Sequence, residues 1–327
     1  MTAPEPELET APEPEPEPGR VDAALRWALG PVPAIRLESF RWALSLALLV
    51  YTLAWALDAR EWLTPAGYHM SGAASYGLQL PVPLLGPRTV ILFLVVYVGA
   101  MVGILLDLRP RLCSFVVFAG LLYVTTADRL AAFSMNKLAL VAWLILLLAP
   151  WPSAAEQRGG EGGEGEDALA ELRSAWPLRI LQASLLIQYV GAGICKLRGD
   201  WLSGAPVLWL QVQGIYMTPL SAWMVRELPV WAWAGLQHGA LAFELLAPLL
   251  FCVARLRPVA FAWGLAMHLA IGLMMYRVGF FSFFVVTYYL LFVDERVLRT
   301  LLRRVTPEVS RRAGVAGRDQ IDRTAGG

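Results

Sequence analysis

The chain has 327 residues, of which 57% are hydrophobic and only 16% are charged, and its mean hydropathy is +0.54. Soluble proteins usually carry about 25% charged residues, so this chain has too little polar material to cover soluble cores. The composition therefore predicts an all-α, polytopic integral membrane bundle embedded in a lipid bilayer. Lys and Arg number 27 against 26 Asp and Glu, a net charge of +1, which gives no electrostatic footprint for nucleic acid.

The N-terminal region begins with MTAPEPELETAPEPEPEPG, a run rich in Glu and Pro without a basic residue. Such a run buries too little apolar surface to offset the entropy of ordering. We therefore expect residues 1–35 to form a disordered acidic tail and leader. A secretory signal peptide starts basic and turns apolar at once, which this region does not do.

Apolar segments follow from Arg41 onwards, and each is a candidate for a membrane-spanning helix, which needs about 20 residues. We expect about eight of them, at roughly 41–57, 89–106, 112–127, 138–150, 178–197, 230–253, 259–275 and 280–293. Between the fourth and fifth lies SAAEQRGGEGGEGED, which predicts a flexible Gly/Glu-rich loop over 153–175. The loop divides the membrane domain, 36–294, into two halves.

Two further stretches lie outside these segments. Residues 201–229 are apolar in places but are broken by Gly and Pro, which predicts short interfacial or re-entrant helices. After Asp294 the sequence DERVLRTLLRRV indicates a basic amphipathic helix on the membrane surface, within a cytoplasmic tail over 295–327.

An ionisable side chain inside a membrane costs at least about 2.5–3.5 kcal/mol of insertion free energy. Each such group therefore needs a partner, a polar cavity or a functional role. Lys196, Glu244 and His268 lie within apolar segments, and His238 lies at the mouth of one. Lys196 ends a polar helical stripe that includes Tyr189. The alternatives are structural: Lys196 snorkels to the interface, while Glu244 and His268 bond neighbouring helices.

In the arrangement of eight membrane segments, several polar residues lie on the same, outer side of the membrane as Lys196. Asn136 and Lys137 precede the fourth segment, and Trp201 opens the irregular stretch. A binding site that opens outward is a reasonable inference, although an ordinary solvated loop has the same composition. The three cysteines are scattered, without a CxxC or Cys/His cluster, so no metal or redox pair is expected.

A resemblance to a known family rests on four stretches. AGICKLRGDWLSG (192–204) resembles the AG-x-x-KL…DW-x-x-G motif of vitamin K-dependent gamma-carboxylases and of the bacterial HTTM (horizontally transferred transmembrane) proteins related to them. FELLAPLLF (243–251), MHLAIGLMM (267–275) and FFSFF (280–284) are similar to later helices of that domain, in the same order. The similarity covers roughly residues 36–294.

The resemblance implies a lysine base and a quinone. In the carboxylases this lysine deprotonates a reduced vitamin K quinone, so the resemblance gives that role to Lys196 and implies a membrane quinone, a vitamin K-like hydroquinone, as cofactor. Desolvation favours a neutral amine, as a general base requires. Asn136-Lys137 falls where the carboxylases have Asn-His. The large luminal region of the carboxylases has no counterpart here, so carboxylation of a protein glutamate is not supported.

Two hypotheses follow. The first is a gamma-carboxylase-like membrane enzyme that acts on a quinone or another lipophilic molecule. The alternative is a non-catalytic membrane protein, either a transporter or an assembly subunit. For the enzyme, the candidate catalytic residues are Lys196, His268 and Glu244, and the candidate substrate-binding residues are Asn136, Lys137, Tyr189, His238 and Trp201.

The basic residues predict the orientation in the cell membrane. Nineteen of the 27 Lys and Arg residues lie on the side of both termini in the eight-segment arrangement, and eight lie on the other. Positive residues favour the cytoplasmic side. A reporter fused after Asp294 should therefore be cytoplasmic, and one inserted near Gly86 should be external. A periplasmic C-terminus, measured with a paired phosphatase and fluorescent-protein reporter, would contradict the even number of spans.

Overall fold

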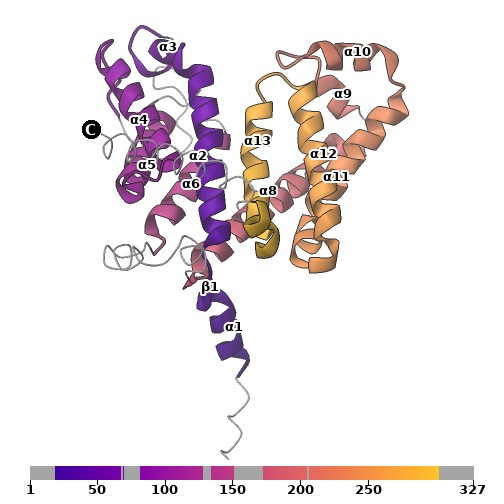
Figure 1. Cartoon of the computed structure of the whole chain (residues 1–327). Coiled ribbons are helices and arrows are strands. Elements are labelled where there is room, and N and C mark those ends of the chain that lie inside the picture. Colours follow the sequence, from indigo (N-terminus) through magenta and orange to yellow (C-terminus); the bar gives the residue numbers. More distant parts are fainter. Residues whose placement is uncertain are drawn as a thin grey trace, which may run out of the picture.

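The computed structural model describes residues 19–67, 69, 82–127, 134–150, 172–204 and 206–301. These residues are overwhelmingly helical (Figure 1). Their one sheet is a pair of three-residue antiparallel strands, β1 (Pro31–Pro33) and β2 (Leu172–Ser174). The predicted all-α class is confirmed. The sequence predicts a flexible loop over 153–175. Its residues 153–171 lie outside the described residues, and residues 172–174 form β2.

Five helices are long and apolar enough to cross a membrane, and three shorter ones are also apolar. Each coincides with one of the predicted apolar segments, so the polytopic membrane bundle is confirmed, while the count of eight spans stays a prediction. The long helices are α2 (Ile35–Ala56), α5 (Pro110–Ala127), α8 (Trp176–Arg198), α11 (Val230–Cys252) and α12 (Arg257–Met274) preceded by η4 (Ala254–Leu256). The shorter ones are α4 (Thr89–Leu105), α6 (Ser134–Leu148) and α13 (Gly279–Thr287), which continues into η5 (Tyr288–Phe292).

Short helices occupy the connections. The irregular stretch 201–229 contains the end of η3 (Asp200–Leu202), then α9 (Val207–Gln211) and α10 (Pro219–Glu227), which confirms the prediction of short helices there. Within the predicted leader, residues 20–29 form α1 (Arg20–Leu29). Helix α3 (Ala59–Leu63) follows α2. Residues 295–301 are helical, and the rest of the predicted amphipathic helix lies outside the described residues.

The helices form two groups (Figure 1). Helices α2, α4, α5 and α6 pack in sequence as one group, and α8, α11, α12 and α13 form the other. Contacts of α2 with α13 and η5 join the two groups. In Figure 1, α3, α9 and α10 lie at one end of the bundle, and α1 and β1 lie at the opposite end. We call the first of these the α10 end.

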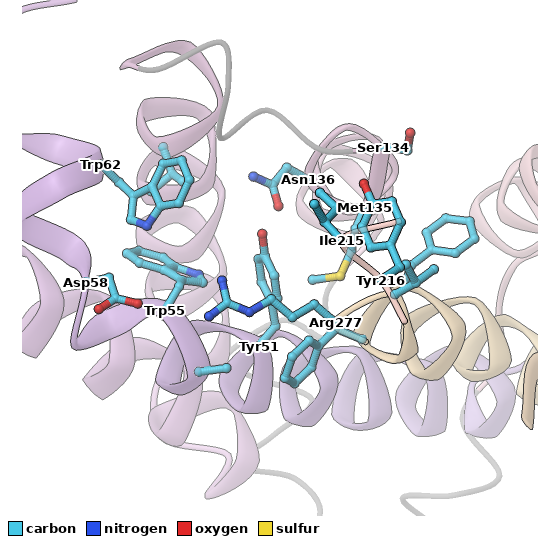
Figure 2. Close-up of a pocket in the computed structure, with 15 residues that line it drawn as sticks. Tyr51, Trp55, Asp58, Trp62, Ser134, Met135, Asn136, Ile215, Tyr216 and Arg277 are labelled. Carbon is cyan, nitrogen blue, oxygen red and sulfur yellow. The ribbon is translucent and has the colours of Figure 1, made fainter. Parts of the chain in front are cut away.

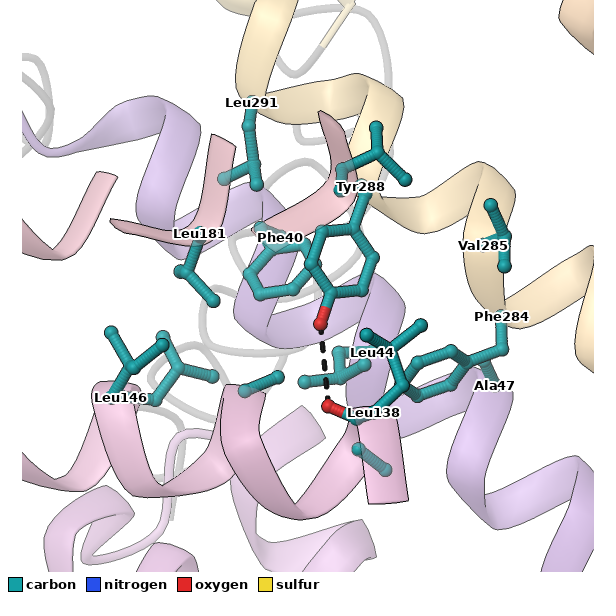
Figure 3. Close-up of a cluster of buried hydrophobic side chains, with 14 of the residues drawn as sticks. Phe40, Leu44, Ala47, Leu138, Leu146, Leu181, Phe284, Val285, Tyr288 and Leu291 are labelled. Atoms are coloured by element: carbon teal, nitrogen blue, oxygen red, sulfur yellow. Dashed lines mark hydrogen bonds between the residues drawn. The ribbon is translucent and has the colours of Figure 1, made fainter. Parts of the chain in front are cut away.

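The core lies where the two groups meet (Figure 3). Phe40 of α2 packs edge-on against Tyr288 of η5, with ring centroids 4.8 Å apart, and both side chains are fully buried. The Tyr288 hydroxyl donates a hydrogen bond of 3.4 Å to the carbonyl oxygen of Leu138 in α6. In lipid the helix surfaces gain little from hydrophobic burial, so close packing and such interhelical hydrogen bonds hold the groups together.

A charged cluster closes the end opposite to the α10 end. Arg41 of α2 is buried, and its Nη2 lies 2.6 Å from Oε2 of Glu38 and 2.9 Å from Oδ1 of Asp107. Arg173 of β2 reaches Glu38 Oε1 at 2.6 Å. Asp107 has a left-handed φ of 55° in the tight α4–α5 turn. One arginine therefore joins α2 to that turn, and Glu38 joins both to the small sheet.

The same end brings the first and last spans together. Arg36, at the start of α2, lies 3.6 Å from Glu295, which follows η5. The start of α2 and the residues that follow η5 therefore lie at the same end of the bundle.

The charged cluster generates a stability prediction. Arg41→Gln removes a buried cation and leaves the carboxylates without their shared partner, which should destabilise the fold by about 3 kcal/mol. Thermal unfolding of the purified protein in detergent should show the loss as a lower Tm. The matched control is Arg111→Gln, an exposed arginine just after the same turn, which should leave Tm unchanged. Equal Tm values for wild type and Arg41→Gln would contradict the role of the cluster.

Candidate functional site

A cavity of about 1080 Å³ lies between the second group of helices and α6 of the first group. Its walls come from α6, α8, α9, α11, α12 and α13, and they are mainly apolar, with many Leu, Met, Ile, Val and aromatic side chains. The polar side chains on the walls are few: Gln188, Tyr189, Lys196, Gln211, Glu244 and His268. We call this the Lys196 cavity. Apolar walls with a few convergent polar groups are typical of sites for lipophilic ligands.

Lys196 and Glu244 form an ion pair across the wall of this cavity. Lys196 Nζ of α8 donates a hydrogen bond to Glu244 Oε1 of α11. The side chains are only 23% and 9% exposed, respectively. The ammonium also lies 4.7 Å from the ring centre of Trp201 in η3, a cation–π contact. Lys196 is thus held by two partners at the cavity wall.

The local sequence allows this pair to form. Gly193 lies one turn before Lys196, and a Cβ at this position would approach Leu245 Cδ2 to 2.8 Å. The glycine therefore lets α8 approach α11 closely, as small residues do between membrane helices. Gln237 of α11 accepts a hydrogen bond from the Leu208 amide at 3.2 Å and donates one to the Trp201 carbonyl at 2.7 Å. These bonds fix η3 and α9 next to the pair.

A second polar group of the cavity is a chain of three side chains. The Tyr189 hydroxyl of α8 lies 2.7 Å from His268 Nε2 of α12 and 2.7 Å from the Tyr289 hydroxyl of η5. Gly264 makes room for it, because a Cβ there would clash with the Tyr289 hydroxyl and with Phe243. Hydroxyl and imidazole groups both donate and accept, so this chain can pass a proton between Tyr289 and His268.

Two buried polar atoms of these residues have no hydrogen-bond partner among the described residues: Glu244 Oε2 and His268 Nδ1. A buried polar atom without a partner costs about 1–3 kcal/mol, and more when the group is charged. Both residues line the Lys196 cavity. As a carboxylate oxygen, Glu244 Oε2 can accept a hydrogen bond, and His268 Nδ1 can donate or accept one, depending on the tautomer.

A family model described as the HTTM domain matches residues 37–296, most of the chain. The chain belongs to the HTTM domain family. No curated protein and no solved structure matches the chain. Together with the apolar helices, the match identifies a multi-pass membrane protein of the HTTM type.

Within the HTTM domain the structure brings together five of the eight residues proposed from sequence. Lys196, Glu244, His268, Tyr189 and Trp201 all line the Lys196 cavity.

The other three proposed residues lie elsewhere. Lys137 and His238 are exposed and line neither this cavity nor its neighbour, and Asn136 is buried on the wall of that neighbouring pocket. His238 lies six positions before Glu244 on α11, which places the two on different faces of the helix. The structure therefore keeps Asn136, Lys137 and His238 apart from the Lys196–Glu244 pair.

Sequence reasoning missed the partners of the proposed residues. It treated Lys196 and Glu244 separately, although two opposite charges, each alone in an apolar segment, are a signal for pairing across helices. Tyr289 and Gln237 were also missed. Tyr289 stands in the run TYYLLF and Gln237 in an apolar helix, and neither has a spacing that marks it as functional.

The pair generates a prediction that separates charge pairing from snorkelling. Lys196→Met leaves Glu244 as an uncompensated buried charge, which should destabilise the HTTM domain by about 3 kcal/mol. The double variant Lys196→Met/Glu244→Gln should recover most of that loss, because neither charge remains. Tm in detergent is the measurement, and Lys137→Met is the exposed control. Additive Tm losses in the double variant would contradict the pairing.

Proposed function

We propose that this HTTM protein is an enzyme of the cell membrane, with both termini cytoplasmic, which binds a membrane quinone in its reduced form in the Lys196 cavity and removes a proton from it. The observation that carries the proposal is the Lys196–Glu244 pair on the wall of a large apolar cavity. An enzyme for a lipophilic substrate needs an apolar site and a proton acceptor within it, and this cavity combines the two.

The size and lining of the cavity support a lipophilic ligand with a ring. Pockets of about 300–1000 Å³ hold drug-sized molecules, and this cavity has about 1080 Å³. Trp201 and Trp263 offer aromatic faces, and Met267, Met274 and Met275 offer flexible apolar contacts. A quinone supplies a redox-active ring with two oxygens when bound, and its isoprenoid tail would take up the apolar remainder of the space.

The pair can act as the proton acceptor. In a poorly solvated site the proton of the pair can reside on Glu244, which leaves the Lys196 amine neutral. The amine then takes the proton of a ligand hydroxyl at Nζ: the O–H bond breaks, the N–H bond forms, and the negative charge stays on the ligand oxygen. The resulting ammonium stabilises that oxygen, while Trp201 holds the Lys196 side chain in place.

His268 and Tyr189 would hold the opposite side of the ring. His268 lines the cavity, and its buried Nδ1, which has no hydrogen-bond partner among the described residues, would bond a second ligand oxygen after a small rotation of the ring. The bond from His268 Nε2 to Tyr189 connects that contact to Tyr289. Because each member can donate or accept, a proton can move along this chain without water. We assign these residues to orientation and proton transfer, and Lys196 to proton removal.

The experiment measures binding and turnover separately. A naphthoquinone with a short isoprenoid tail is titrated into protein in detergent, and quenching of tryptophan fluorescence reports binding. Turnover in air-saturated buffer is then followed by the rise in quinone absorbance, because the deprotonated hydroquinone gives two electrons to dissolved oxygen, which is reduced to hydrogen peroxide. Lys196→Arg and Lys196→Ala should both lose at least about 100-fold in turnover, because a guanidinium cannot accept a proton. Binding should change by less than about tenfold.

Lys137→Ala is the matched control, since Lys137 is exposed and lies outside the cavity. It should keep wild-type binding and turnover. Full turnover in Lys196→Arg would remove Lys196 from the role of base. Absence of saturable quenching in the wild type would overturn the quinone as ligand. Binding without turnover in the wild type would favour the alternative, a non-catalytic membrane protein.

A further inference from the structure

A second pocket, of about 480 Å³, lies beside the Lys196 cavity at the α10 end (Figure 2). It is formed by the end of α2, α3, the start of α6, the loop before α10 and the turn between α12 and α13. Val278 and Phe281 line both spaces. The residues that matter for its chemistry are Tyr51, Trp55, Asp58, Trp62, Tyr216 and Arg277. We call it the Arg277 pocket.

Arg277 is held in an unusual backbone conformation. Its φ is 64°, in the left-handed region, which costs an arginine about 1–3 kcal/mol. The surrounding turn is fixed from two sides: the Tyr276 amide donates a hydrogen bond of 2.6 Å to the Tyr216 carbonyl, and Met217 pairs with Met275 in a β-bridge. The turn therefore directs the Arg277 side chain into the pocket, where Figure 2 shows its guanidinium near Tyr51 and Trp55.

The pocket contains a positive and a negative side chain that do not form an ion pair with each other. Arg277 makes no ion pair with any described residue, and its contact within the protein is with the ring of Tyr276, at 5.4 Å. Asp58 stands on the same pocket, next to the Trp55 indole in Figure 2, and also has no ion-pair partner within the described residues. The Trp55 indole lies next to the carboxylate in this view, and the Trp62 indole lies beyond Trp55.

We infer that the Arg277 pocket binds the headgroup of a zwitterionic phospholipid, with the phosphate on Arg277 and the ammonium on Asp58 and the indoles. A guanidinium binds phosphate oxygens through two parallel hydrogen bonds. Carboxylate and indole faces together bind an ammonium group. An aromatic pocket with one cation and one anion thus matches a ligand that carries both charges.

The surroundings favour a lipid over a soluble zwitterion. Leu57, next to Asp58, is 93% exposed, and the lining residue Ile215 is 86% exposed. Apolar side chains so exposed on a multi-pass membrane protein indicate contact with acyl chains. Trp and Tyr side chains also concentrate at the headgroup level of membranes. This inference rests on the membrane location of the chain and not on the proposed quinone chemistry.

Native mass spectrometry of the delipidated protein in detergent tests the inference. Phosphatidylethanolamine, which carries an ammonium, and phosphatidylglycerol, which does not, are added at equal concentration. The wild type should retain phosphatidylethanolamine at least tenfold more strongly. Asp58→Asn should reduce that ratio to about one. Arg277→Asn, which tolerates the left-handed φ, should weaken retention of both lipids at least tenfold. Arg277→Lys, which keeps the charge but cannot form the two parallel hydrogen bonds, should weaken retention of both lipids, but less than Arg277→Asn does.

Matched controls are Glu61→Gln, one turn beyond Asp58, and Arg226→Gln on α10; both residues are exposed and lie outside the two pockets. Both variants should retain the wild-type lipid preference. Equal retention of the two lipids by the wild type would overturn the inference. Displacement of the lipid by submillimolar free phosphoethanolamine would also overturn it, in favour of a soluble zwitterion.

Discussion

The ion pair between Lys196 and Glu244 is the contact on which the second half of the HTTM domain depends. Each charge alone would be costly within an apolar helix, so the two residues need one another. They meet because Gly193 leaves no side chain between α8 and α11. Tyr189 lies one turn before Gly193 on α8. The close approach of α8 and α11 places it against α12 and η5. One ionic constraint thus positions both polar groups of the cavity.

The cavity exists because the helices around the pair do not close over it. Short helices η3 and α9 line this side of the cavity, and Gln237 bonds their backbone to α11. The broken stretch therefore has a structural consequence, since it leaves apolar walls open beside a charged pair.

The two ends of the bundle use charge differently. At the end opposite to the α10 end, Arg41, Glu38, Asp107 and Arg173 bind each other, and their role is to join α2 to the α4–α5 turn and the small sheet. At the α10 end, Arg277 and Asp58 line a pocket without an ion pair to any described residue. Charges satisfied within the protein stabilise it, whereas charges left open are available to a ligand.

The amino-acid sequence alone determined the membrane class, the apolar helices to within a few residues, the short helices of 201–229 and the HTTM family, because hydropathy and local motifs are properties of contiguous residues. It also identified Lys196, Glu244 and His268 as the costly groups. Only the tertiary structure decided that Lys196 pairs with Glu244, that His268 joins Tyr189 and Tyr289, and that Asn136 lines a different pocket. These relations depend on helix rotation and approach, which are set by packing between residues far apart in the chain.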